Sequence, residues 1–156
     1  MINLERALQK DAKELLALQK ECFLPYEVKY GDLETNPIHM SLHRMEFNLK
    51  YKFGQYYKIV DFESEEIVGG LFIFELDSKE IMKIAQFYLK KEYQHQGLGK
   101  MVLEAVMKKN NGVKTWYVDT ILQEDYNVSF YKCCGFEIID TEVEHEGLTF
   151  VTMQKK

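Results

Sequence analysis

The hydrophobic period of this sequence changes near residue 97. Before that point, three successive segments, residues 55–62, 66–76 and 80–89, have the pattern of strands, with short turn-forming connections between them. After it, apolar residues recur at the i, i+3, i+4, i+7 and i+8 spacing of one helix face: Leu98, Met101, Val102, Ala105 and Val106. We therefore expect three antiparallel strands followed by an amphipathic helix over residues 97–109.

The N-terminal part of the sequence predicts one short strand and two helices. The strand covers residues 2–4. The first helix opens at Asp11, which has the type of an N-cap, and we expect Pro25 to end it. The pair Asn36-Pro37 then supplies an N-cap and a first-turn proline for a second helix that continues to about residue 52.

The C-terminal part predicts a strand, a short helix and two further strands. The expected ranges are residues 113–120 for the strand, 125–134 for the helix, and 136–143 and 148–153 for the last strands. The order β-α-α-β-β-β-α-β-α-β-β combines hairpins with β-α-β units. It predicts an α/β (mixed α+β) fold, a mixed central sheet of about seven strands with helices on both faces.

Length and composition indicate one packed domain. The chain has 156 residues, of which 46% are hydrophobic, 13% aromatic and 29% charged, and this is typical of a globular protein. We expect a single domain over residues 1–156. The formal charge of -5, with no Lys/Arg run longer than a pair, argues against nucleic acid as a partner and mildly favours a cationic substrate.

The compartment is expected to be the cytoplasm. The apolar run at residues 67–74 is too short to cross a bilayer, and residues 1–5 do not resemble a signal peptide, so we expect no membrane partner. Three cysteines, with Cys133 and Cys134 adjacent, cannot form a disulfide framework and suit a reducing compartment.

Residues 87–100 carry the most specific chemical signal. They lead from a strand through a tight loop into a helix, and Gly97 and Gly99 let the backbone approach a ligand where free N–H groups and the helix dipole favour phosphate. The alternative is that these glycines only allow the tight turn and bind no ligand. A P-loop is excluded because Gln94 stands at its first glycine position and Met101 at its hydroxyl position, and the dinucleotide fingerprint lacks one glycine.

The segment Gln94-His95-Gln96-Gly97-Leu98-Gly99 resembles the acetyl-CoA motif Gln/Arg-x-x-Gly-x-Gly/Ala of the GCN5-related N-acetyltransferase (GNAT) superfamily. A second likeness lies at residues 130–136, Phe-Tyr-Lys-Cys-Cys-Gly-Phe, which is similar to the family's Phe-Tyr-x-x-x-Gly-Phe. The element order agrees as well, so the resemblance covers nearly the whole chain. It implies a GNAT-like fold and an acetyl-CoA-dependent N-acetyltransferase that acts on a primary amine of a small molecule, peptide or protein.

The resemblance also implies a set of cofactor-binding residues. The strand end offers main-chain groups to the pantetheine arm, and the loop and the helix start hold the pyrophosphate. The full set is Phe87, Tyr88, Leu89, Gln94, His95, Gln96, Gly97, Leu98, Gly99, Lys100 and Asn127. Two positions depart from the family pattern: Lys91 is found where the family usually has a proline, and Glu124 where it usually has an asparagine. Asn127 is the expected substitute for that asparagine, or else a helix cap.

Two catalytic residues are predicted, each with a simpler alternative. Tyr131 matches the family's tyrosine that protonates the departing thiolate, whereas position alone would make it a packed helix residue. Asp119 is the expected general base, because some peptide N-terminal acetylating relatives carry a glutamate at this place. Glu75 and Glu92 are alternatives, and each of the three carboxylates is also readily explained as a solvated surface group.

Several possibilities stay open at this level. His39 and His43 have an i, i+4 spacing on the expected second helix but lack the glutamate and third ligand of a zinc site, so no metal is predicted. We expect the acceptor pocket to form from that helix, its flanking loops and the region near His145. The alternatives to an enzyme are a non-catalytic acyl-CoA-binding regulatory module and an unrelated α/β interaction domain. A homodimer is possible.

Overall fold

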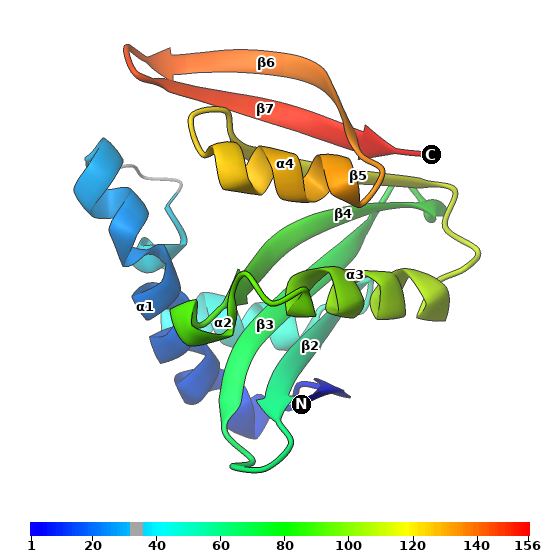
Figure 1. Cartoon of the computed structure of the whole chain (residues 1–156). Coiled ribbons are helices and arrows are strands. Elements are labelled where there is room, and N and C mark those ends of the chain that lie inside the picture. Colours follow the sequence, from blue (N-terminus) through cyan, green and yellow to red (C-terminus); the bar gives the residue numbers. More distant parts are fainter. Residues whose placement is uncertain (32–35) are drawn as a thin grey trace. The chain divides into compact units, whose positions relative to one another are not determined.

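The computed structural model describes residues 1–31 and 36–156, and part of the segment between the first two expected helices lies outside these residues. Within them, seven strands form one sheet in the order β1-β2-β3-β4-β5-β7-β6 (Figure 1). Their bounds are β1 Ile2–Arg6, β2 Gly54–Asp61, β3 Ile67–Leu76, β4 Ser78–Leu89, β5 Thr115–Ile121, β6 Glu137–His145 and β7 Leu148–Lys155. The sheet contains parallel and antiparallel pairs, which confirms the predicted mixed sheet.

Four α-helices and three 3-10 turns connect the strands in the described part of the chain. The helices are α1 Ala12–Tyr30, α2 Leu42–Lys50, α3 Leu98–Lys109 and α4 Asp125–Cys133. The 3-10 turns are η1 Gln9–Asp11, η2 Pro37–His39 and η3 Lys91–Tyr93. The order of helices and strands is the predicted one, with the 3-10 turns added.

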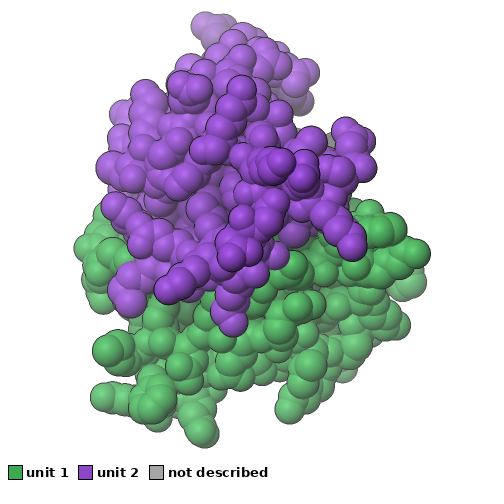
Figure 2. All heavy atoms as spheres, turned by 90° about the vertical axis from the view of Figure 1, so that its right-hand side faces the viewer, with its two compact units in different colours: residues 1–73, 86–99 green, residues 74–85, 100–156 purple. Residues whose placement is uncertain are grey.

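The chain divides into two compact units, which Figure 2 colours separately. Unit 1 contains residues 1–73 and 86–99, and unit 2 contains residues 74–85 and 100–156. In unit 1, β1 pairs antiparallel with β2 from Ile2–Asp61 to Arg6–Tyr57, and α1 contacts α2 and η2. Its fully buried side chains include Leu15, Met45, Ile59 and Leu71.

Unit 2 is organised around the β6–β7 hairpin. Strand β7 pairs antiparallel with both β5 and β6, and the β6–β7 register shifts between Ile138 and Asp140. Residues 81–84 of β4 pair in parallel with residues 115–118 of β5. The core of this unit includes Leu103, Val106, Leu148 and Met153, which are fully buried.

The prediction that Pro25 ends the first helix is wrong, because α1 continues to Tyr30 and is capped by Gly31 at φ +86°. A proline removes one main-chain donor and strains the preceding turn, but later residues can still make helical hydrogen bonds. The N–H of Gly31 donates to the carbonyl of Glu27, and the Glu27 carboxylate lies 3.1 Å from His39 Nε2. These contacts stabilise the last turn of α1 beyond the proline.

The predicted second helix consists of two separate elements. Asn36 caps only the 3-10 turn η2, where its Oδ1 accepts from the N–H of Ile38 at 3.0 Å. The chain then becomes extended at Met40, and the hydroxyl of Ser41 caps α2 by accepting from the N–H of Arg44. His39 and His43 therefore lie on different elements, so the i, i+4 helical spacing that we expected for them does not exist.

Candidate active site

The loop between β4 and α3 has the backbone of an anion-binding turn. His95 has φ +60° and Gly97 has φ +80°, whereas Gln96 between them has negative φ. Residues of alternating handedness turn successive N–H groups toward a common side, and α3 adds the free donors of its first turn from Leu98. A Cβ built on Gly97 would meet no atom within 4 Å, so the surface at this residue is open to a ligand.

The side chains of two loop glutamines hold the loop itself. Gln94 Nε2 donates to the carbonyl of Leu89 at 2.8 Å, and Gln96 Nε2 donates to the carbonyl of Glu92 at 2.7 Å. Their amides are thus used to close the turn. The chemistry available to an anion at this loop comes from main-chain N–H groups, while the His95 side chain is exposed.

The end of β4 is fixed from inside unit 1 by Tyr88. Its hydroxyl oxygen lies 2.6 Å from that of Tyr56 and 3.5 Å from the carbonyl of Leu15. Burial raises the pKa of both tyrosines, so both phenols stay protonated at neutral pH. Gly70 leaves the space for the Tyr88 ring, because a Cβ there would lie 2.5 Å from its hydroxyl.

The backbone of Phe87, Tyr88 and Leu89 lies beyond the part of β4 that pairs with β5. The register of this pair ends at Ile84, opposite Val118. Tyr88 and Leu89 are buried and Phe87 is half-buried. This segment therefore has well-fixed side chains at a place where the β4–β5 hydrogen-bond ladder no longer continues.

The predicted acid, Tyr131, is a buried residue of α4 in unit 2. Its side chain is 8% exposed, and its ring packs edge-on against Phe130 and Phe136 with centroids 5.1 and 5.5 Å away. Asn127 lies one turn earlier on the same helix and is half-buried. The N-cap position of α4 is occupied by Glu124, so the cap alternative for Asn127 is wrong.

The predicted base, Asp119, lies on β5 with its side chain 43% exposed. Its Oδ2 is 2.7 Å from Lys83 Nζ, and its Oδ1 accepts from the hydroxyl of Thr152 at 2.8 Å. Thr152 is also the cross-strand partner of Asp119 on β7. Both carboxylate oxygens thus have donors, which sequence reasoning could not foresee. An ammonium substrate would have to replace Lys83 at Oδ2.

The other predicted positions are distributed over the two units. In unit 2, Lys100 is exposed and lies 3.9 Å from Glu104, and Glu75 is half-buried on β3. Glu92 is exposed in η3 of unit 1. His145 is exposed at the end of β6 in unit 2, where its Nδ1 lies 2.9 Å from the carbonyl of Glu146.

A shallow depression of about 480 Å³ lies on α2 and the residues after it, all within unit 1. Phe47 stacks on Tyr51, and Lys52 lies 4.9 Å above the ring of Phe53. The residues that line it are His43, Glu46, Phe47, Lys50, Tyr51, Lys52 and Phe53. We expected acceptor contacts from this segment but not from its aromatic residues in particular, and the signal for them in the sequence is their clustering over positions 47–53.

The part of the chain that the structure describes lacks two features. Over residues 1–31 and 36–156, no group of three His, Cys, Asp or Glu side chains is arranged to hold a metal ion. No helix in these ranges combines the length and apolar character that a membrane crossing needs.

Comparison with protein families identifies the chain. The family model described as acetyltransferase (GNAT) domain matches residues 33–156, which include every predicted site residue. The chain belongs to the GNAT acetyltransferase family. As a GNAT protein it is an N-acetyltransferase with acetyl-CoA as the donor. No curated protein matches it.

Solved structures share the GNAT fold over the whole chain. The PaiA N-acetyltransferase from Thermoplasma acidophilum, solved with coenzyme A, is 21% identical with a TM-score of 0.75, over 100% of this chain and 99% of that one. A GNAT acetyltransferase from Streptococcus pneumoniae is 18% identical, with a TM-score of 0.74 and 99% coverage of both chains. A spermidine N-acetyltransferase SpeG chimera from Vibrio cholerae and hSSAT is 15% identical, with a TM-score of 0.77, and the match covers 99% of this chain and 94% of that one.

Proposed function

We propose that acetyl-CoA binds with its pyrophosphate on residues 94–99 and that its acetyl group is transferred to a primary amine. The observation that carries this proposal is the open Gly97 with φ +80°, which lies immediately before α3 in the loop that follows β4 and η3. An open turn of alternating handedness that presents main-chain N–H groups fits a diphosphate, and a side chain at Gly97 would occupy the same space.

The end of β4, before the loop, is proposed to orient acetyl-CoA. Main-chain groups of Phe87 and Leu89 bind the peptide-like pantetheine arm as an added strand would. The Leu89 carbonyl already accepts from Gln94, so its remaining lone pair and the main-chain N–H groups are the contacts we assign to the donor. Acetyl-CoA supplies the acetyl group as a reactive thioester, and the strand backbone holds that thioester in place for the amine.

Two residues of unit 2 are proposed to move protons. The phenol of Tyr131 donates a proton to the sulfur of the leaving thiolate, and the Asp119 carboxylate accepts one from the incoming ammonium. Asn127 replaces the asparagine contact that Glu124 cannot supply. Glu75, Glu92 or solvent takes the role of base if Asp119 remains bound to Lys83.

The net charge and the fold support a proposal for the acceptor class. The formal charge of -5 favours a cationic acceptor, and one protein of the same fold is a spermidine N-acetyltransferase chimera. We propose a primary amine of a small molecule or a peptide as the acceptor, with contacts from the α2 segment in unit 1. We also propose that residues 1–156 act as one cytoplasmic N-acetyltransferase domain; a homodimer stays a prediction.

The test is a panel of amines assayed for release of free CoA thiol from acetyl-CoA. Polyamines, amino acids, aminoglycosides, lysine peptides and peptides with free N-termini cover the acceptor classes. Amine-dependent thiol release supports the proposal and ranks the classes. Tight acetyl-CoA binding without release by any amine would instead support a non-catalytic acyl-CoA-binding regulatory module.

A further inference from the structure

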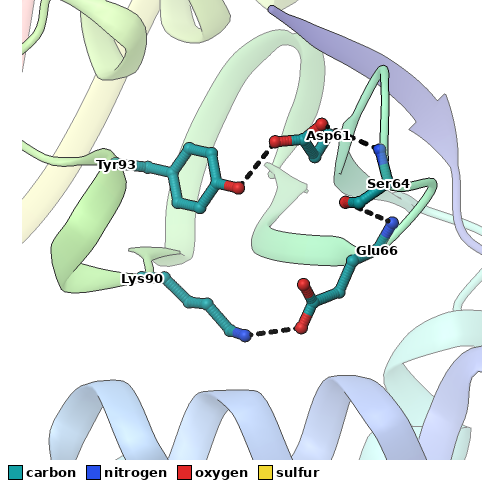
Figure 3. A network of polar contacts seen from close by, with 5 residues as sticks. All are labelled: Asp61, Ser64, Glu66, Lys90 and Tyr93. Carbon is teal, nitrogen blue, oxygen red and sulfur yellow. Dashed lines mark hydrogen bonds and ion pairs between the residues drawn. The ribbon is translucent and has the colours of Figure 1, made fainter.

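The turn between β2 and β3 is joined by side chains to the segment that precedes the glycine loop. Figure 3 shows this network, in which the Tyr93 hydroxyl points at Asp61 and the Lys90 ammonium points at Glu66. All of its residues belong to unit 1. None of them lies within residues 94–99, so the acetyl-CoA motif itself does not account for them.

Asp61 is the centre of the first half of the network. Its Oδ1 accepts from the N–H groups of Glu63 and Ser64 at 2.8 and 3.1 Å, which fixes the β2–β3 turn. Its Oδ2 accepts from the Tyr93 hydroxyl at 2.6 Å. The Tyr93 hydroxyl and these two N–H groups lower the pKa of the Asp61 carboxyl, and the same hydrogen bond raises the pKa of Tyr93. A neutral phenol therefore donates to a carboxylate across the neutral range.

Lys90 forms the second half. Its ammonium lies 2.7 Å from Glu66 Oε1, and its main-chain N–H donates to the carbonyl of Val68 at 2.8 Å. The hydroxyl of Ser64 accepts from the N–H of Glu66, which links the two halves through the same turn. Residues 61–68 thus hold both ends of the short segment from Lys90 to Tyr93.

This segment determines where the glycine loop begins. The N–H of Tyr93 donates to the carbonyl of Lys90, and the N–H of Gln94 donates to that of Lys91. Fixing Tyr93 therefore fixes the backbone of Gln94, the first residue of the motif. A loop that is ordered before binding does not lose that conformational freedom when the ligand arrives, so preorganisation raises affinity without a direct contact.

We propose that Tyr93 and Asp61 are positioning residues, which hold residues 94–99 in the conformation that receives the pyrophosphate of CoA. The inference rests on the proposed function, because it takes this loop as the pyrophosphate site. It assigns a role in donor affinity to the β2–β3 turn, which belongs to unit 1 and lies outside the motif sequence.

The first experiment measures CoA binding by calorimetry, which needs no acceptor. Tyr93→Phe removes one hydroxyl, and Asp61→Asn removes the charge that accepts its hydrogen bond. Each substitution should raise the Kd for CoA about three- to tenfold. The double variant should have the same Kd as either single variant, because both substitutions remove the same Tyr93–Asp61 hydrogen bond. Glu63→Gln is the matched control: it removes a charge from the same turn but keeps the main-chain bond to Asp61, and its Kd should stay within about twofold of wild type.

The second experiment separates positioning from general structural damage. With an acceptor from the amine panel, Tyr93→Phe should raise the KM for acetyl-CoA and leave kcat unchanged. S-acetylpantetheine carries the same thioester without the pyrophosphate, so its kcat/KM should be equal in wild type and variant. The end of β4 that binds this arm is held separately by Tyr88.

Each other outcome overturns the inference in a recognisable way. Unchanged CoA affinity in Tyr93→Phe and Asp61→Asn would show that the network does not prepare the loop, while the proposed function would stand. Equal losses of kcat/KM with acetyl-CoA and with S-acetylpantetheine would show that the network stabilises unit 1 as a whole and does not position the loop. A wild-type protein that binds no CoA at all would overturn the proposed function and this inference with it.

Discussion

The hydroxyl oxygens of Tyr56 and Tyr88 lie 2.6 Å apart in the core of unit 1, which joins β2 to the end of β4. Gln19 of α1 adds its Oε1 at 3.5 Å from the Tyr56 hydroxyl. The pair is buried, so its hydrogen bond has no competition from water. It fixes Tyr88 between Phe87 and Leu89, whose backbones are proposed to bind the donor.

The first prediction concerns the space that Gly70 leaves for this pair. Gly70→Ala places a Cβ 2.5 Å from the Tyr88 hydroxyl and should lower the free energy of unfolding by about 1–3 kcal/mol, measured by chemical denaturation. Gly112→Ala is the control, because its Cβ would meet nothing within 4 Å, and it should change stability by less than about 0.5 kcal/mol. Equal effects of the two changes would contradict the packing that we describe.

The second prediction concerns Gly97. Gly97→Glu puts bulk and negative charge where the pyrophosphate is proposed to bind, so acetyl-CoA should no longer raise the melting temperature. Gly147→Glu is the matched control, since Gly147 also has positive φ and open surroundings but lies in the β6–β7 turn. Both variants carry similar backbone strain, and only the control should keep the acetyl-CoA shift. A shift retained in Gly97→Glu would place the cofactor elsewhere.

The third prediction concerns Tyr131. Tyr131→Phe keeps the ring that packs against Phe130 and Phe136 and removes only the hydroxyl. Turnover should fall roughly ten- to a thousandfold while the Kd for acetyl-CoA stays nearly unchanged, as expected for loss of a general acid. Tyr126→Phe, on an exposed tyrosine of the same helix, should keep wild-type turnover. Full activity of Tyr131→Phe would refute the assigned role.

The fourth prediction concerns Asp119 and its ion pair. Asp119→Asn keeps the size of the side chain but cannot accept a proton, so turnover should drop at neutral pH and recover partly as pH rises and more acceptor amine is neutral. Lys83→Met breaks the same ion pair and leaves the carboxylate, so it should keep its turnover. If the pH–rate profile of Asp119→Asn overlays that of wild type, the base is Glu75, Glu92 or solvent.

Local patterns were sufficient for the strands and for the glycine turn. The strand pattern over residues 55–89 depends on neighbouring residues only, and the bounds of β2, β3 and β4 agree with the expected ranges within one or two residues. The conformation at Gly97 also follows from local geometry, because few other residues adopt positive φ there without strain.

Helix limits required information that is not local. Pro25 is tolerated because contacts of Glu27 and Gly31 stabilise the turns that follow it. On α3, Met101 was expected on the buried face but is 55% exposed, whereas Leu103, outside the expected face, is fully buried. The buried face of α3 is set by how the helix packs in unit 2, which the spacing of apolar residues does not specify. The adjacent cysteines differ in the same way, since Cys133 is exposed and Cys134 is buried.

The partners of the site residues were beyond sequence reasoning for the same reason. Asp119 meets Lys83 and Thr152 through the registers of β5 with β4 and β7, which no single segment specifies. Tyr93 and Asp61 are 32 positions apart and meet only because the β2–β3 turn folds against η3. Such contacts depend on strand register and turn geometry together.

The fifth prediction addresses the central claim, acetyl transfer from acetyl-CoA bound at residues 94–99 to an amine. The measurement is mass spectrometry of the best acceptor in the amine panel after incubation with acetyl-CoA that carries an isotope-labelled acetyl group. We expect labelled N-acetyl product in one-to-one ratio with free CoA for wild type, and none above background for Gly97→Glu. Labelled product formed equally well by Gly97→Glu, or no product from any amine by a wild type that binds acetyl-CoA, would contradict the account.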